Sequence, residues 1–193
     1  MTILSVNKTR EQRMGAVRPF FYGEVMRKNA HFITNAAILA AAYVALTHLQ
    51  NLLLPGSATW AIQFRVSEAL CILAFFTPAA IPGLTVGCLL FNFTYSAALP
   101  LDFLVGSLAS GLSAAAMWST RKVTVRGCPL PGLLMPALFN ALLVGWELSV
   151  YIGGGFAINA LYVAIGEAAV LLTLGWLLYA MIRKRRLDSR LFR

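Results

Sequence analysis

The sequence is poor in charged residues, which make up 12% of the chain, whereas hydrophobic residues make up 59%. Soluble domains carry about a quarter charged residues. A membrane-spanning helix needs about 20 mostly apolar residues, so 193 residues are enough for six such helices with short connections. The composition excludes an ordinary soluble domain. It predicts an all-α integral membrane protein, a bundle of six transmembrane helices with no separate soluble domain.

Motifs that carry catalysis or hold metals are also missing. The chain has no HExxH, GxSxG or P-loop sequence, each of which supplies a defined constellation of reacting groups. Its two histidines, His31 and His48, fall 17 positions apart on one predicted helix and cannot share a metal ion. The three cysteines, Cys71, Cys88 and Cys128, have the spacing of neither a zinc site nor a disulfide framework. We therefore expect no catalytic residue, no metal and no cofactor.

Positive charge is concentrated in three places, and the formal net charge is +9. Basic clusters occupy residues 1–30, 121–126 and 183–193. Short loops rich in Lys and Arg stay in the cytoplasm, so these clusters predict cytoplasmic N- and C-termini around a transmembrane domain at 31–182. Nucleic-acid binding is the alternative, but the clusters lack interleaved aromatic residues and a recognition helix.

Six apolar segments fit this topology. The turn sequence "AAIPG" and the run "GGG" at 153–155 separate four of them, because the residue before a proline is disfavoured in a helix and glycine runs break helices. The expected helices cover about 31–54, 65–79, 82–98, 101–119, 132–152 and 156–182.

Small residues recur at helical spacing. Ala37, Ala41 and Ala45 lie at i, i+4 and i+8 on one face of the first predicted helix, next to Ala36 and Ala40. Small residues let another helix approach closely in lipid, so this face could be a docking surface, although alanine is common in membrane helices. Two further motifs predict packing inside the bundle: Gly83-x-x-x-Gly87 and Ser107-x-x-x-Gly111-x-x-x-Ala115.

Five ionisable residues fall within the apolar segments, where charges are costly and usually face the bundle interior or a water-filled cavity. Arg65 and Glu68 are three positions apart and can pair on one helical face. Asp102 lies at a helix start, where its charge favours the helix dipole. The other two are Glu147 and Glu167.

Polar residues near the two C-terminal glutamates indicate a ligand pocket. Asn140 and Glu147 are seven positions apart on one helical stripe, with Trp146 beside them, and Tyr162 lies near Glu167. Two carboxylates, an amide and aromatic rings suit a polar ligand. The alternative is that each glutamate pairs with Arg65 or an internal hydroxyl only to stabilise the fold.

Four stretches resemble the QueT family: "IQFRVSEAL", "FFTPAAIPGLTVGCLLFN", "FNALLVGWEL" and "VAIGEAAVLLTLG". Members are substrate-binding S components of energy-coupling factor (ECF) importers for queuosine precursors. The resemblance implies a six-helix bundle in the bacterial plasma membrane that binds substrate near the outer face. It also implies docking through the small residues of the first helix onto a membrane coupling subunit. Two partner ATPases would hydrolyse ATP, and the S component would topple in the membrane to release its ligand.

The implied ligand is a 7-deazaguanine, either the 7-cyano or the 7-aminomethyl form, or queuine. One carboxylate can accept the ring N–H and the exocyclic amine together, a second carboxylate would favour the aminomethyl cation, and aromatic rings can stack on the base. We expect Glu147 or Glu167 to bind the base edge. The other expected substrate-binding residues are Asn140, Gln63, Arg65, Glu68, Trp60, Trp146, Tyr162 and Asn92.

Three other functions stay open at this point. The chain could be an S component for another small vitamin or nucleobase. It could be a self-sufficient secondary transporter that couples ions or protons through Glu147 and Glu167. Intramembrane enzyme chemistry through the same two glutamates is the third, and the missing motifs count against it.

Overall fold

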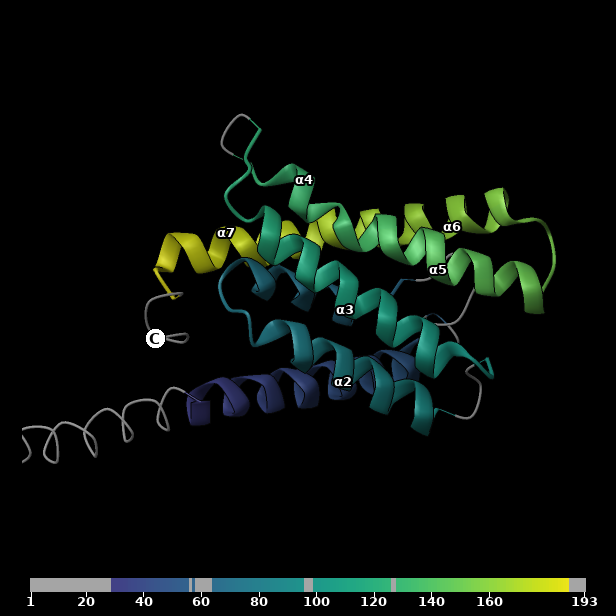
Figure 1. Ribbon diagram of the computed structural model, residues 1–193, viewed down its shortest axis with the longest axis horizontal. Helices are drawn as coiled ribbons and strands as arrows, with labels where there is room; N and C mark the ends of the chain where they lie inside the picture. Colours follow the sequence, from purple (N-terminus) through teal and green to yellow (C-terminus); the bar gives the residue numbers. More distant parts are fainter. Residues whose placement is uncertain (1–28, 56, 58–63, 96–98, 126–127, 188–193) are drawn as a thin grey trace, which may run out of the picture. The chain divides into compact units, whose positions relative to one another are not determined.

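The computed structural model describes residues 29–55, 57, 64–95, 99–125 and 128–187. Within these ranges every regular element is a helix, apart from an isolated bridge between Val125 and Cys128. The all-helical class predicted from the sequence is confirmed. In chain order the elements (Figure 1) are the first helix Asn29–Leu53, the 3₁₀ helix η1 (Val66–Phe75), α2 (Ala80–Thr94), α3 (Asp102–Thr120), α4 (Leu130–Leu133), α5 (Met135–Tyr151), α6 (Phe156–Val170), the π-helical turn η2 (Leu171–Gly175) and α7 (Trp176–Arg185).

Four helical segments in the described ranges are long and apolar enough to cross a membrane. They are Asn29–Leu53, Asp102–Thr120, Leu130–Tyr151 and Phe156–Arg185. The remaining two, η1 and α2, have 10 and 15 residues, which gives each a length of about 20 Å against a hydrocarbon core of about 30 Å. The number of spans and the orientation of the ends therefore stay predictions.

The segment predicted as an α-helix over 65–79 is different in the structure. It is a 3₁₀ helix that begins at Val66 and ends at Phe75. Arg65 precedes it in extended backbone, with φ −88° and ψ 101°. The expectation that Arg65 and Glu68 share one face of a regular helix is therefore wrong.

The breaks between the later helices follow the expected residues. Gly153, Gly154 and Gly155 have φ values of 85°, 83° and 85°, which glycine adopts without the steric cost that other residues have. They separate α5 from α6, as the sequence predicts. Two interruptions were not expected: Leu134 between α4 and α5, and the π-helical turn η2 before α7.

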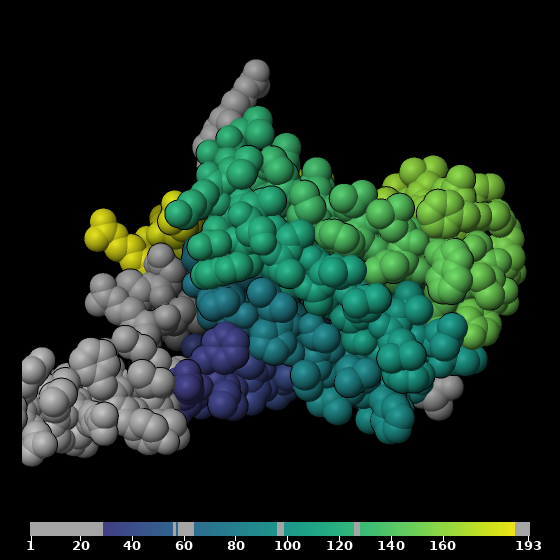
Figure 2. All heavy atoms as spheres, viewed as in Figure 1, coloured from purple at the N-terminus to yellow at the C-terminus, as the bar shows by residue number. Residues whose placement is uncertain are grey.

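Small residues bring the helices close together within the compact unit Asn35–Arg193. A Cβ atom at Gly83 would lie 2.8 Å from the carbonyl oxygen of Ala36, and one at Gly87 would lie 3.0 Å from that of Ala40. The first helix and α2 are therefore in direct backbone contact, and the predicted Gly83-x-x-x-Gly87 packing motif is confirmed. The side chains of α2, α3 and α5 lie side by side on the face shown in Figure 2.

Candidate functional site

A cluster of buried charged residues lies inside the helical unit Asn35–Arg193. Every Asp and Glu in the described part of the chain belongs to it. Most charged side chains of a folded protein are exposed to water, and the few that are buried are paired, hydrogen-bonded or functional. The exposed fractions are 2% for Arg65, 0% for Glu68, 4% for Asp102, 0% for Glu147 and 1% for Glu167.

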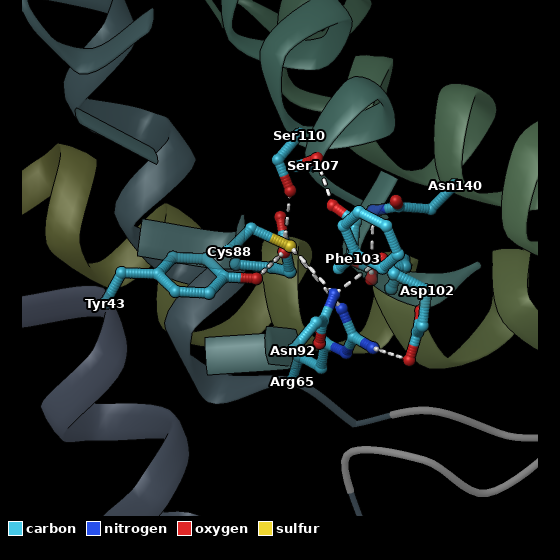
Figure 3. Close-up of polar contacts among 11 residues, drawn as sticks. Tyr43, Arg65, Cys88, Asn92, Asp102, Phe103, Ser107, Ser110 and Asn140 are labelled. Atoms are coloured by element: carbon cyan, nitrogen blue, oxygen red, sulfur yellow. Dashed lines mark hydrogen bonds and ion pairs between the residues drawn. The ribbon is translucent and has the colours of Figure 1, made fainter. Parts of the chain in front are cut away.

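Arg65 is held against the beginning of α3. Its Nη2 lies 3.5 Å from Oδ2 of Asp102 (Figure 3). The Asn92 amide of α2 donates to the Asp102 carbonyl at 2.8 Å and to Cys88 Sγ at 3.5 Å. Gly106 leaves room for this contact, because a Cβ there would lie 2.8 Å from Asn92 Nδ2. Arg65 Nη1 also donates to Cys88 Sγ of α2 at 3.9 Å, so the guanidinium contacts both α2 and α3.

Glu68 has donors on both carboxylate oxygens. The Tyr43 hydroxyl of the first helix donates to Oε1 at 2.6 Å, and Ser110 of α3 donates to the same oxygen at 3.5 Å. The Cys71 thiol donates to Oε2 at 3.1 Å. Glu68 therefore ties η1 to the first helix and to α3.

The predicted stripe on α5 is confirmed. Asn140, Val144 and Glu147 are all buried, with exposed fractions of 4%, 2% and 0%. The Asn140 amide donates to Oε1 of Glu167 at 3.1 Å and joins α5 to α6. Gly145 permits the close approach of these two helices, because a Cβ there would lie 2.7 Å from Cα of Ala160.

Several acceptors in this part of the cluster have no hydrogen-bond partner. They are both carboxylate oxygens of Glu147, Oε2 of Glu167, Oδ1 of Asp102 and Oδ1 of Asn92. Most buried polar atoms in proteins are hydrogen-bonded, and each exception calls for an explanation. An array of open acceptors suits a ligand rich in N–H donors.

The two glutamates belong to one electrostatic environment. Glu147 interacts with Asp102 and Arg65, and Glu167 interacts with Glu68 and Arg65. No group of three or more His, Cys, Asp or Glu side chains in the described ranges is arranged to hold a metal ion.

Other predicted site residues lie elsewhere. Trp146 and Tyr162 have exposed fractions of 49% and 40%, unlike the buried cluster, and their stacking on a ligand stays a prediction. Trp146 is adjacent to Glu147 and faces about 100° away from it around the helix. Tyr162 is five positions from Glu167, about 140° away. Gln63 and Trp60 lie outside the described residues.

Sequence reasoning missed several members of the cluster. Asp102 begins α3, as the sequence predicts, but it also pairs with Arg65, and Cys71 and Cys88 contact Glu68 and Arg65. Tyr43 and Ser110 were not considered. A buried carboxylate in an apolar segment requires donors, which is a signal for hydroxyl-bearing neighbours but does not say which ones.

The small residues of the first helix divide between two faces. Ala40 is buried and Ala36 half-buried, and both meet the glycines of α2. Ala37, Ala41 and Ala45 are exposed. Among the residues that the structure describes, the outward stripe is therefore not used for packing.

Comparison with known proteins agrees with these features. A family model described as QueT transporter matches residues 33–184. The queuosine precursor transporter QueT of Lactococcus lactis subsp. cremoris is 38% identical over 86 residues, which are 44% of this chain and 48% of the relative. The match thus spans about half the length of that relative. No solved structure matches.

The family model covers most of the chain, including all four helical segments that are long enough to cross a membrane except the first few residues of the first and the last residue of the fourth. The apolar helices and the family match identify a multi-pass protein of the cell membrane. The chain belongs to the QueT transporter family.

Proposed function

We propose that this chain is the substrate-binding S component of an ECF-type importer and captures a 7-deazaguanine precursor of queuosine. The observation that carries the proposal is the set of unpartnered acceptors on Glu147 and Glu167, fully buried in a bundle of apolar helices. The name of the Lactococcus relative, a queuosine precursor transporter, supports the ligand class.

The donor pattern of a 7-deazaguanine fits these acceptors. Its ring N–H and exocyclic amine lie side by side, so one carboxylate can accept both. Its carbonyl oxygen needs a donor, and the Arg65 guanidinium lies in the same cluster. Guanidinium groups are common partners of base acceptors. Edge recognition of this kind gives selectivity for the base.

The proposed membrane arrangement has six helical segments with both ends in the cytoplasm. It is supported by the three basic clusters of the sequence, because Lys and Arg are enriched in cytoplasmic loops. In this arrangement η1 and α2 would each be part of a membrane crossing, and short connections would join them to their neighbours. The glutamates would then lie towards the outer mouth.

Transport would require partner chains. The exposed stripe of Ala37, Ala41 and Ala45 would dock on a membrane coupling subunit, and two cytoplasmic ATPases would drive release of the ligand by toppling of this chain. Replacing Ala41 with Leu should prevent co-purification with the coupling subunit and leave ligand binding intact. A buried-face control, Ala40→Leu, should instead disturb the contact with α2.

The direct test is isothermal titration of the purified chain with three deazaguanines: the 7-cyano form, the 7-aminomethyl form and queuine. Guanine and riboflavin serve as controls. The proposal expects tight binding of at least one deazaguanine and weaker binding of both controls. A folded, monodisperse chain that binds no deazaguanine would refute the ligand class.

A second candidate function is a self-sufficient secondary transporter. Buried, unpartnered carboxylates are the groups that proton-coupled transporters use, and Glu147 is such a group. Proteoliposomes that contain this chain alone distinguish the two functions. Uptake driven by a proton gradient without partner subunits would favour the secondary transporter, and uptake that requires the ATPases would favour the importer subunit.

A further inference from the structure

We infer that Glu147 and Glu167 bind different parts of the ligand, and that the site selects a 7-deazaguanine with a protonated primary amine over neutral relatives. The inference rests on the proposed function and goes beyond it by assigning the two carboxylates and the charge of the ligand. It is carried by a difference in hydrogen bonding: both carboxylate oxygens of Glu147 lack a partner, whereas Glu167 has one partnered and one unpartnered oxygen.

Glu147 is the group suited to the base edge. Both of its oxygens are unpartnered, and the side chain is 0% exposed. A base edge with two adjacent N–H donors needs two adjacent acceptors, as a carboxylate offers to a bidentate partner. Glu167 offers a less open pair, because its Oε1 already accepts a hydrogen bond from the Asn140 amide at 3.1 Å.

Glu167 is suited to a single charged donor. Its Oε2 has no hydrogen-bond partner, and its side chain is 1% exposed. The Asn140 contact fixes the orientation of this carboxylate on α6. An ammonium group is a compact charge with three donors and no acceptor, so it needs only one open oxygen to form a charge-assisted hydrogen bond.

The charge balance of the cluster points the same way. Four carboxylates lie there with one cation, Arg65, whose ion pair with Asp102 is 3.5 Å long. Glu167 also interacts with the carboxylate of Glu68. A ligand that brings a positive charge offsets this excess, whereas a buried anion left without a partner costs free energy.

Neutral substituents leave Glu167 unsatisfied to different degrees. A 7-cyano group has no donor and would place an acceptor beside Oε2. A 7-hydroxymethyl group is nearly the same size as the 7-aminomethyl group and has a neutral donor. Comparing these three ligands therefore separates charge from size and from hydrogen-bonding capacity.

The experiment is isothermal titration of the full chain with the 7-aminomethyl, 7-hydroxymethyl and 7-cyano forms of 7-deazaguanine. We expect the amine to bind at least about tenfold more tightly than the alcohol, because charge-assisted hydrogen bonds are about twice as strong as neutral ones, and the nitrile to bind most weakly. In Glu167→Gln the amine and the alcohol should bind within about threefold of each other. In Glu147→Gln all three ligands should weaken by a similar factor.

Each result has a distinct meaning. Equal affinities of the native chain for the three ligands would overturn the inference while leaving the proposed function intact, and this comparison needs no variant to fold. A Glu167→Gln chain that keeps the native preference for the amine would also overturn it. Failure of a folded native chain to bind any of the three would instead remove the proposed function on which the inference rests.

Discussion

Glu68 and Glu147 are both completely buried, but their surroundings differ. Glu68 accepts hydrogen bonds from Tyr43, Cys71 and Ser110, whereas neither oxygen of Glu147 has a partner. Burial of a charge is tolerated when protein donors compensate it. Glu68 meets that condition within the fold. In the proposed function, the ligand supplies the partner that Glu147 lacks.

The contrast extends to the regions around them. On the Glu68 side, the Thr47 hydroxyl donates to Ser67 Oγ at 2.7 Å, and Gln50 accepts from the Val66 backbone at 2.7 Å. These bonds link the first helix to η1. Between α5 and α6, Asn140 donates to Glu167 Oε1, but Glu167 Oε2 and both carboxylate oxygens of Glu147 have no hydrogen-bond partner. We propose that the first region stabilises the fold and that the second binds the ligand.

The largest expected effect separates these two roles directly. Glu147→Gln replaces one acceptor of the base edge with a donor, so two charge-assisted hydrogen bonds are lost or weakened. At about 1.5–3 kcal/mol for each bond, deazaguanine binding should fall by about 100-fold or more. Titration calorimetry measures this loss. The melting temperature should not decrease, because no protein donor loses its acceptor.

A matched control for this change lies on the same helix. Ser149→Ala removes a hydroxyl that bonds only to the Trp146 carbonyl at 2.6 Å, and it should leave ligand affinity unchanged. If Glu147→Gln lowered the melting temperature and left binding intact, Glu147 would belong with Glu68 as a structural residue and the comparison would fail.

The next largest effect is expected in the region around Glu68. Tyr43→Phe removes the donor at 2.6 Å from Glu68, and Glu68→Gln removes the charge that this donor stabilises. Each change should lower the free energy of unfolding by about 1–3 kcal/mol. Because the two groups contact each other, the double variant should be less destabilised than the sum of the single variants. Thermal denaturation in detergent compares the stability of the three variants. Strictly additive effects would argue against the hydrogen bond between Tyr43 and Glu68.

Periodicity in the sequence was sufficient to predict one half of the site. Asn140 and Glu147 are seven positions apart, which is nearly two helical turns, and both are buried on the same side of α5. The same periodicity places Trp146 and Tyr162 on other sides of their helices from the glutamates, and both side chains are exposed. Their contact with a ligand therefore stays a prediction.

The other half depended on contacts between distant segments. Arg65 pairs with Asp102 on α3, 37 positions along the chain, and the sequence favoured Glu68 because it is near. That local interpretation assumed an α-helix, whereas the structure has a 3₁₀ helix that begins after Arg65. Ion-pair partners across a bundle depend on helix packing, which a single sequence does not determine.

A smaller effect is expected at the close contact between α5 and α6, the helices that carry Glu147 and Glu167. In Gly145→Ala the new Cβ would lie 2.7 Å from Cα of Ala160, so α5 and α6 must separate. Overpacking of this kind costs about 1–3 kcal/mol. Ligand affinity should fall by a few fold, because Glu147 and Glu167 are on the two displaced helices. Leu142→Ala, on the exposed face of α5, is the control and should change neither quantity.

The smallest expected effect concerns Trp146, whose side chain is 49% exposed and adjacent in sequence to Glu147. Trp146→Leu keeps an apolar side chain on this surface and removes the aromatic ring. Since the ring faces away from the buried cluster, deazaguanine affinity should change by less than about twofold. A stacked ring would contribute about 1–3 kcal/mol, a factor of roughly 5 to 150. A loss in that range would place Trp146 on the ligand and show that the ligand site extends to the exposed face of α5.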